Sequence, residues 1–272
     1  MTSSDRKAIF ITGAASGMGR ETARLFAARG WLVGGYDIDG TGLAALREEL
    51  GAAAVTGVLD VTDRAGYAAA LTGFARASGG RLDLLFNNAG IGSAGYFDEQ
   101  DIDDLLAVIN VNLVGVLQGI HLAAPLLKAT PGSLCFTTSS SSATFGMPGI
   151  AVYSATKHAV RGLTEALSIE FARHGVRVAD TLPGLIDTAI LPAHVRTNAP
   201  REGMFRLIPP LAVAQAVWAA YHDDRQRLHW FVPEEIGELD KASALDPEGT
   251  RARLTSQGVV TAMMNAADRE RD

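Results

Sequence analysis

The sequence is poor in cysteine and in basic residues, and each shortage excludes a class of protein. Its 272 residues include one cysteine, Cys135, so no disulfide can form within the chain and no zinc site can rest on cysteine ligands. Lysine and arginine together number 24, against 30 aspartates and glutamates, which gives a net charge of −6. Nucleic-acid binding needs a concentrated basic surface, so no such partner is expected. The 6 histidines have no metal-ligand spacing, and no metal is expected.

Long uncharged runs are also scarce, with one exception. The first residues, MTSSDRKAIFITG, contain no long apolar core, so we expect no signal peptide and a cytoplasmic protein. From Leu105 to Leu127, however, 23 residues carry no acidic or basic side chain, which is enough to cross a bilayer. Polar groups are costly in lipid, and this run contains Asn110, Asn112, Gln118 and His121. The run therefore predicts a helix buried against a sheet or a second subunit, with no membrane partner.

What the chain does contain is a regular alternation of apolar strand-like runs with helical patterns. The runs KAIFITG, WLVGGYD, RLDLLFN and SLCFTT are each followed by a segment with helical periodicity, and 47% of all residues are hydrophobic. Such an order is typical of a parallel sheet with helices on both faces. No linker divides the chain. We therefore predict an α/β fold, a single doubly wound domain of Rossmann type spanning residues 1–272.

Ligands of such sheets bind beyond the carboxyl ends of the strands, and the first two strand ends suit a dinucleotide. The first strand runs into TGAASGMG, in which Gly13, Gly17 and Gly19 let the backbone approach a pyrophosphate at a helix N-terminus, although a structural turn uses glycine equally well. The second strand ends at Asp37. A carboxylate there accepts hydrogen bonds from the ribose of NAD and repels the 2′-phosphate of NADP. Its alternative role is to cap the next helix, for which Asp39 is better placed.

The stretch TTSSSSATFGMPGIAVYSATK, residues 137–157, follows a later strand end. Its serines and glycines are also typical of a flexible linker. It ends, however, in Tyr153 and Lys157, which lie four residues apart and so share one face of a predicted helix. An adjacent ammonium lowers the pKa of a phenol from about 10, as a general base near neutral pH requires. A pair at this spacing is common by itself, but the polar strand end beside it favours an active site.

Taken together, these motifs resemble the short-chain dehydrogenase/reductase family. TGAASGMG, Asp60, NNAG, NVNLVG, a serine 13 residues before the tyrosine, YSATK and LPGLIDT occur in the family's order, over about residues 9–188. The resemblance implies that Tyr153 is the general acid/base and that Lys157 lowers its pKa and holds the nicotinamide ribose. It also implies that Asn112 positions Lys157 through water and that Ser140 binds the substrate oxygen.

The same resemblance assigns a set of cofactor-binding residues along the strand ends. They are Gly13, Ser16, Gly17, Met18, Gly19, Asp37, Asp60, Val61, Asn88, Ala89, Gly90, Tyr153, Lys157, Pro183, Gly184, Ile186 and Thr188.

The carboxyl third carries a predicted lid and an unusual tail. Residues 185–210 read as an irregular loop with apolar side chains, which we interpret as a substrate lid over an apolar pocket that includes Phe145 and Met147. Packing on the core is the alternative, and Arg196, Arg201 and Arg206 leave contact with an anionic substrate open. The tail, residues 234–272, lacks the family's usual ending. The two long helical segments could pair between subunits, so a homodimer or homotetramer is expected.

The sequence therefore predicts an NAD(H)-dependent oxidoreductase that interconverts a secondary alcohol and a ketone on a moderately apolar small molecule. Two alternatives stay open at this stage. One is an NADP-linked 3-oxoacyl reductase, and the other is a non-catalytic NAD-binding regulatory protein that has kept the fold. The set formed by Asn112, Ser140, Tyr153 and Lys157 argues against the second.

Overall fold

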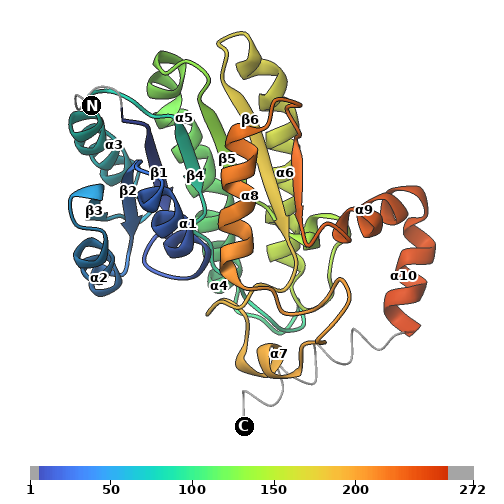
Figure 1. The fold of residues 1–272 in the computed structure, drawn as a ribbon. Helices are drawn as coiled ribbons and strands as arrows, with labels where there is room; N and C mark the ends of the chain where they lie inside the picture. The colour runs from blue at the N-terminus through green and yellow to red at the C-terminus, as the bar shows by residue number, and fades with distance from the viewer. Residues whose placement is uncertain (1–5, 257–272) are drawn as a thin grey trace.

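The computed structural model describes residues 6–256, which form a parallel sheet covered by helices on both faces (Figure 1). Within that range the sheet has 7 strands in the order β3-β2-β1-β4-β5-β6-β7. Every neighbouring pair is parallel, so the carboxyl ends of the strands meet at one edge. The predicted α/β doubly wound fold is thus confirmed. The strands are β1 (Ala8–Thr12), β2 (Leu32–Asp37), β3 (Ala54–Val58), β4 (Leu84–Asn87), β5 (Leu134–Thr138), β6 (Arg177–Pro183) and β7 (His229–Val232).

The central strands are buried on both faces because each carries apolar side chains at successive positions. In β1, Ile9 and Ile11 pack toward one cluster, whereas Ala8 and Phe10 pack toward the other. The same alternation recurs in β4 and β5, as the two-residue period of a strand requires. This is why these strands read as continuous apolar runs rather than as alternating ones.

The helices divide between the two apolar clusters. One cluster joins the sheet to α1, α2 and α8, and the other joins it to α3, α5 and α6. In Figure 1, α1 and α8 lie together in front of the sheet. The helices of residues 6–256 are α1 (Gly17–Ala28), α2 (Gly40–Leu50), α3 (Arg64–Ser78), α4 (Ile102–Ile109), α5 (Gly115–Ala129), α6 (Ala151–Ala172), α7 (Ala193–Asn198), α8 (Pro210–His222), α9 (Ile236–Leu245) and α10 (Pro247–Ser256). Shorter 3₁₀ turns lie at Gly51–Ala53 and Ser141–Ala143.

The uncharged segment of the sequence forms one long helical stretch with an unexpected interruption. Helices α4 and α5 are joined by a π-helical turn, Asn110–Val114, so the stretch runs from Ile102 to Ala129. Among the described residues it is the one helix whose length and composition would suffice to cross a membrane. It nevertheless packs on α3 and α6, and Val116, Ile120 and Leu127 lie in the apolar core. Apolar helices that are buried in a protein core commonly meet the same criterion of length and composition.

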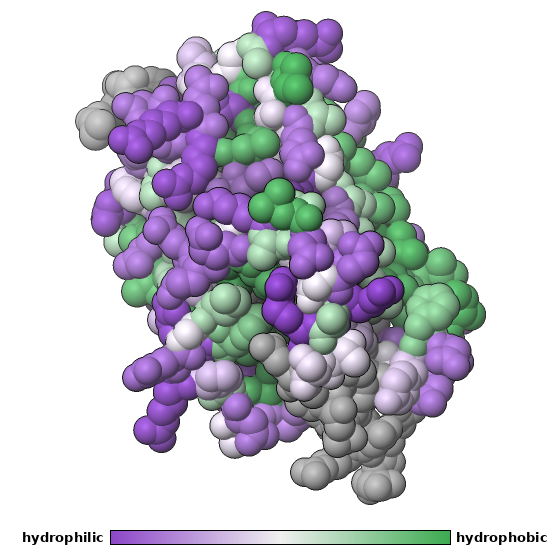
Figure 2. Space-filling model, turned by 90° about the vertical axis from the view of Figure 1, so that its right-hand side faces the viewer, coloured by the Kyte–Doolittle hydropathy of each residue, from purple (hydrophilic) through white to green (hydrophobic). Residues whose placement is uncertain are grey.

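The prediction that residues 185–210 form an irregular loop is wrong in one detail, because this segment contains the short helix α7. Ile186 and Ile208 are buried and form an isolated parallel bridge, so the two ends of the segment are held together. Figure 1 places α7 beyond the carboxyl edge of the sheet. Of the tail, α9 and α10 are described, whereas the part of the 234–272 prediction that falls on residues 257–272 lies outside the described residues. Seen from the side of β7 and α9, the surface is mainly hydrophilic, with apolar side chains gathered along one margin (Figure 2).

Candidate active site

The glycine-rich turn after β1 is shaped by contacts that leave no room for side chains. Gly13 and Gly17 have positive φ angles of 69° and 51°. A Cβ on Gly19 would stand 2.0 Å from the carbonyl oxygen of Gly13, which no larger residue tolerates. Ser16 is the N-cap of α1, but its side chain makes no capping hydrogen bond. The N-terminal N–H groups of α1 are therefore not satisfied by that side chain, and the turn is a cradle that fits a pyrophosphate.

Asp37 ends β2 with both carboxylate oxygens fixed by backbone donors. Oδ2 accepts a hydrogen bond from the N–H of Ala15 at 3.0 Å, and Oδ1 accepts one from Asp39 at 3.0 Å. The cap of α2 is Asp39, whose side chain accepts from the N–H groups at the start of that helix. The interpretation of Asp39 as the cap is confirmed, and Asp37 is left as a carboxylate beside the glycine turn.

The third strand end is organised by its own turn. Oδ1 of Asp60 accepts hydrogen bonds from the N–H of Thr62 at 2.8 Å and from its hydroxyl at 2.7 Å. Val61 is buried, and its carbonyl oxygen accepts from Nε2 of Gln118 at 2.9 Å. Asp60 thus shapes the turn that presents Val61 and ties it to α5.

Two threonines that the sequence analysis did not single out connect the central strand ends. The Thr12 hydroxyl accepts hydrogen bonds from the N–H groups of Asn88 and Ala89, at 3.0 and 3.1 Å. Nδ2 of Asn88 donates to the carbonyl oxygens of Thr12 and Gly13, and the Thr138 hydroxyl donates to Oδ1 of Asn88 at 3.2 Å. Asn88 therefore locks the ends of β1, β4 and β5 together. The sequence feature that could have indicated this role is that both threonines are the last residues of apolar strands.

Asn112 lies in the π-helical turn and is completely buried. Its Oδ1 accepts from the N–H of Ile91 at 2.9 Å, and its Nδ2 donates to the carbonyl oxygen of Ile91 at 2.8 Å. A Cβ on Gly90 would stand 3.2 Å from Oδ1 of Asn112 and 3.8 Å from Nζ of Lys157, so glycine keeps this space open. The π turn thus brings Asn112 to the loop after β4, near Lys157. Single π turns inside α-helices are frequent at functional sites.

Ser140, Tyr153 and Lys157 converge beyond the end of β5. Ser140 directly follows Ser139, and its hydroxyl accepts a hydrogen bond from the N–H of Ser142 at 3.1 Å. The same hydroxyl acts on the phenol of Tyr153, whose pKa it tends to lower. Nζ of Lys157 lies 5.4 Å from the centre of the Tyr153 ring and donates to the carbonyl oxygen of Thr138 at 2.9 Å. The Ser139 hydroxyl points instead to the backbone of Lys157, at 3.0 Å. Of these two serines, Ser140 is the one whose hydroxyl interacts with the tyrosine phenol.

Burial governs the acid–base properties of this group. It raises the pKa of the half-buried Tyr153 phenol, and the hydrogen bond to Ser140 opposes that rise. The same loss of hydration lowers the pKa of Lys157 to about 8. Lys157 was expected to lower the pKa of Tyr153, but in the folded protein the net shift of that pKa is upward. The reason is that burial of the phenol raises its pKa by more than the interaction with Ser140 lowers it.

The loop after β6 returns to the glycine turn. Gly184 donates to the carbonyl oxygen of Val232 at 2.8 Å, next to Pro183 at the end of β6. Ile186 is buried, and its carbonyl oxygen accepts from the Thr188 hydroxyl at 3.3 Å. Cγ2 of Thr188 lies 2.9 Å from the position that a Cβ of Gly17 would take. Of the predicted residues of this loop, Thr188 is thereby brought to the start of α1.

Histidines and acidic residues form no alternative site for a metal among residues 6–256, where no group of three or more possible ligands converges. His158 bonds the backbone of its own helix through Nδ1, at 2.8 Å from the carbonyl oxygen of Ser154. Cys135 is buried, and burial raises the pKa of its thiol to about 12, so this thiol is unreactive near neutral pH.

A doubly wound parallel sheet with a glycine-rich turn between β1 and α1 defines the class of Rossmann-type α/β proteins. Comparison with known proteins narrows this class. The profile of the short chain dehydrogenase family matches residues 7–199. The chain is 34% identical over 225 residues to a cyclohexanol dehydrogenase of Acinetobacter sp., covering 81% of this chain and 89% of the relative. This chain belongs to the short chain dehydrogenase family, and it is an oxidoreductase of that family.

Two further similarities agree with this assignment. A 3-oxoacyl-(acyl-carrier-protein) reductase of Thermotoga maritima is 36% identical over 221 residues, covering 78% of this chain and 88% of that protein. A crystal structure of a short chain dehydrogenase/reductase from Burkholderia phymatum, in complex with NAD, superposes with a TM-score of 0.79 at 27% identity. That similarity covers 91% of this chain and 96% of the other.

Proposed function

We propose that this protein is an NAD(H)-dependent dehydrogenase/reductase that interconverts a secondary alcohol and a ketone on a moderately apolar small molecule. The observation that carries the proposal is the convergence of three side chains beyond the end of β5: the Ser140 hydroxyl acts to lower the pKa of the Tyr153 phenol, and Nζ of Lys157 lies 5.4 Å from the centre of the tyrosine ring. These side chains stand at the carboxyl edge of the sheet, where ligands of this fold bind. The names of the relatives, a cyclohexanol dehydrogenase and a 3-oxoacyl reductase, support chemistry at a carbon that bears oxygen.

The residues of this chain take distinct roles in the proposed reaction. The Ser140 hydroxyl binds the substrate oxygen and orients it toward the phenol of Tyr153. In the direction of reduction, Tyr153 donates its proton to that oxygen, and in the direction of oxidation it accepts the proton of the alcohol. A raised pKa keeps the phenol protonated at neutral pH and so favours the role of acid. When bound, the nicotinamide supplies or accepts the hydride.

Lys157 and Asn112 prepare the cofactor side of the site. Lys157 is buried, is held by the carbonyl oxygen of Thr138, and is the cation proposed to bind the nicotinamide ribose. Asn112 holds the Ile91 backbone, and with Gly90 it bounds the space next to Nζ of Lys157. We assign to Asn112 the positioning of Lys157 through a bridging water.

The choice of NAD over NADP rests on Asp37. Its two oxygens already accept backbone hydrogen bonds from Ala15 and Asp39, which fixes the carboxylate at the end of β2. A fixed carboxylate accepts from ribose hydroxyls and repels a 2′-phosphate. The relative solved in complex with NAD supports this choice. The 3-oxoacyl reductase relative is the observation that favours the second candidate, an NADP-linked 3-oxoacyl reductase, and Asp37 argues against its cofactor.

The proposed architecture is one catalytic domain, residues 1–272, with a substrate lid at 185–210 and an atypical tail at 234–272. The lid is closed at its base by the bridge between Ile186 and Ile208. Arg196 and Arg206 are paired with acidic residues, Arg196 with Asp187 at 3.9 Å and Arg206 with Glu235 at 2.8 Å. These pairings argue against an anionic substrate at those two arginines.

We also propose a cytoplasmic homodimer or homotetramer. Apolar side chains are exposed on the stretch formed by α4, the π turn and α5, and on α6, which are the helices expected to pair; they are Ile102, Leu106, Val114, Leu117 and Ile169. Covering them in a partner's surface would remove apolar area from water. Sedimentation of the purified protein at several concentrations measures this state, and a monomer at every concentration would rule it out.

A screen of secondary alcohols and ketones with NAD and NADH, followed by the absorbance of reduced nicotinamide, tests the proposed reaction. On the best substrate found, Tyr153→Phe should lower kcat by about 10²- to 10⁴-fold, because it removes the proton-transfer group and little else. NADH binding, measured by fluorescence, should change little. Near-normal turnover in Tyr153→Phe would rule out the mechanism. The absence of turnover with every alcohol and ketone would rule out the reaction.

A further inference from the structure

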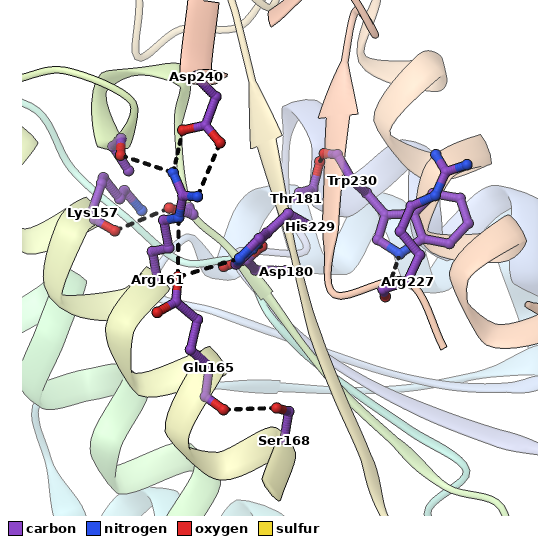
Figure 3. Close-up of polar contacts among 12 residues, drawn as sticks. Lys157, Arg161, Glu165, Ser168, Asp180, Thr181, Arg227, His229, Trp230 and Asp240 are labelled. Carbon is purple, nitrogen blue, oxygen red and sulfur yellow. Dashed lines mark hydrogen bonds and ion pairs between the residues drawn. The ribbon is translucent and has the colours of Figure 1, made fainter. Parts of the chain in front are cut away.

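Helix α9, which belongs to the unusual tail, is attached to α6 by one ion pair (Figure 3). Arg161 of α6 donates from Nη1 to Oδ1 of Asp240 and from Nη2 to Oδ2 of Asp240, the latter at 3.0 Å. The two side chains are only 22% and 19% exposed. A pair of parallel hydrogen bonds between a guanidinium and a carboxylate is the strongest and most directional form of ion pair. The orientation of Arg161 is therefore set by a residue of the tail.

The same guanidinium also reaches the loop that carries Ser140. Nη1 of Arg161 donates to the carbonyl oxygen of Ala143 at 3.3 Å. The N–H of Ala143 in turn donates to the carbonyl oxygen of Ser140 at 2.9 Å, and that of Ser142 donates to the Ser140 hydroxyl at 3.1 Å. Ala143 ends the 3₁₀ turn that begins directly after Ser140. Arg161 thus clamps this turn onto α6.

The position of Arg161 on its helix makes the clamp relevant to the site. Arg161 follows Lys157 by four residues and Tyr153 by eight, so all three lie along one face of α6. From the far side, Nε of Arg161 donates to Glu165 at 3.3 Å, and Glu165 lies 3.4 Å from Nε2 of His229. The helix that carries the tyrosine and the lysine is consequently joined to the serine turn through a side chain that is held on two sides.

We propose that Arg161 is a positioning residue for Ser140 and that Asp240 of the tail holds it in that role. The guanidinium fixes the carbonyl oxygen of Ala143, the turn fixes Ser140, and the Ser140 hydroxyl is thereby kept against the phenol of Tyr153. The inference rests on the catalytic role proposed above for Ser140. It gives the atypical tail a function, because without α9 the guanidinium loses the partner that sets its orientation.

The test compares three variants on the substrate identified by the screen. Arg161→Met removes the guanidinium and keeps an unbranched apolar stem, Asp240→Asn removes the charge of its partner, and Ser140→Ala removes the positioned group. A displacement of about 1 Å at a reacting group lowers the rate by about 10²-fold, so Arg161→Met should lower kcat ten- to a hundredfold. Asp240→Asn should lower it less. The affinity for NADH should stay within about twofold, because the glycine turn and Asp37 do not contact Arg161.

A double-mutant cycle separates positioning from a merely structural role. In the Ser140→Ala background, Arg161→Met should change kcat by less than about threefold, because the group that it positions is already gone. Lys241→Ala is the matched control, since Lys241 lies next to Asp240 on α9 and pairs with Glu238 of the same helix, at 2.9 Å. This control should keep the kcat of the original protein.

The outcomes that overturn the proposal are distinct from those that overturn the reaction. Losses in Ser140→Ala and Arg161→Met that multiply in the double variant would show that Arg161 does not act through Ser140. A lowered melting temperature with unchanged kcat in Arg161→Met would show that the ion pair of Arg161 and Asp240 only stabilises the structure. If Arg161→Met does not fold, the same cycle with Arg161→Lys or Asp240→Asn decides in its place. A proposed function that is wrong shows itself earlier, as unchanged turnover in Tyr153→Phe.

Discussion

Nζ of Lys157 donates a hydrogen bond of 2.9 Å to the carbonyl oxygen of Thr138, the last residue of β5. This bond places a cation at the carboxyl edge of the sheet while the side chain is only 3% exposed. Burial of the ammonium lowers its pKa from 10.5 to about 8, so the folded protein carries an energetic cost that the unfolded chain does not. The site is therefore organised at the expense of stability, as functional sites often are.

Lys157→Met should abolish activity without destabilising the fold at neutral pH. The lowered pKa corresponds to roughly 3 kcal/mol of destabilisation by the charged group. Loss of the hydrogen bond to Thr138 offsets about 1–3 kcal/mol of the gain, so the variant should be as stable as the original protein or up to about 2 kcal/mol more stable. Urea unfolding at pH 7 measures this difference.

The pH dependence of stability provides the control for that prediction. Between about 8 and 10.5 the unfolded chain holds a proton on Lys157 that the folded protein has released. The free energy of unfolding of the original protein should therefore contain a contribution that rises with pH across this range, and Lys157→Met should lack it. If the two proteins show the same pH dependence from 8 to 10.5, the ammonium is not destabilised by burial.

The rates of the two reaction directions should depend on pH in opposite ways. Burial raises the pKa of Tyr153 above 10, so the phenol is protonated near neutral pH. Reduction, which needs the proton, should be independent of pH near neutrality and fall only in alkali. Oxidation, which needs the phenolate, should increase with pH throughout the range in which the protein is folded. Profiles of kcat in both directions measure this, and an oxidation rate that is flat from pH 6 to 10 would contradict it.

The three neighbouring serines should differ in their effects because their hydroxyls have different partners. Ser140→Ala removes the hydroxyl that acts on the Tyr153 phenol and should lower kcat on the order of 10²-fold, as loss of one donor to the reacting oxygen does. Ser139 donates to the backbone of Lys157, so Ser139→Ala should cost about 1 kcal/mol of stability with a smaller effect on kcat. Ser141→Ala is the control and should resemble the original protein. Equal kcat losses in all three would exclude the assignment of Ser140.

The fold could be predicted because its strands are mainly apolar and its helices are amphipathic. The candidate site residues beyond β5 could also be predicted from the sequence, since the spacing of Tyr153 and Lys157 places both on one helix face. The π turn at Asn112 was not, because a single extra residue in a helical turn leaves no mark on periodicity. Composition also gives no burial depth, and burial decides the direction of the Tyr153 pKa shift.

Contacts between segments that are distant in the sequence could not be predicted from it either. Arg161 and Asp240 are separated by 79 residues, and neither position is unusual for a surface helix. Thr12 and Thr138 lie at the ends of apolar strands, where a threonine is an ordinary strand residue. Only the parallel order of the sheet brings both to Asn88. These are relationships of topology, and they become visible when the strand order is known.

Cofactor preference follows from the fixed carboxylate of Asp37. The backbone N–H of Ala15 holds its Oδ2 at 3.0 Å, so the charge cannot turn away from a ligand that lies on the glycine turn. An unmodified ribose gains hydrogen bonds there, whereas a 2′-phosphate meets a like charge, and Ala15 and Ile38 provide no cation beside it. The expected preference for NAD is about a hundredfold in kcat/KM. Asp37→Ala should remove most of it by weakening NAD and relieving NADP. Asp39→Ala is the matched control, because Asp39 caps α2, and it should lower stability while leaving the ratio of the two cofactors unchanged. If the original protein uses NADP better than NAD, a cation from elsewhere in the chain reaches the ribose and the assignment of NAD is wrong.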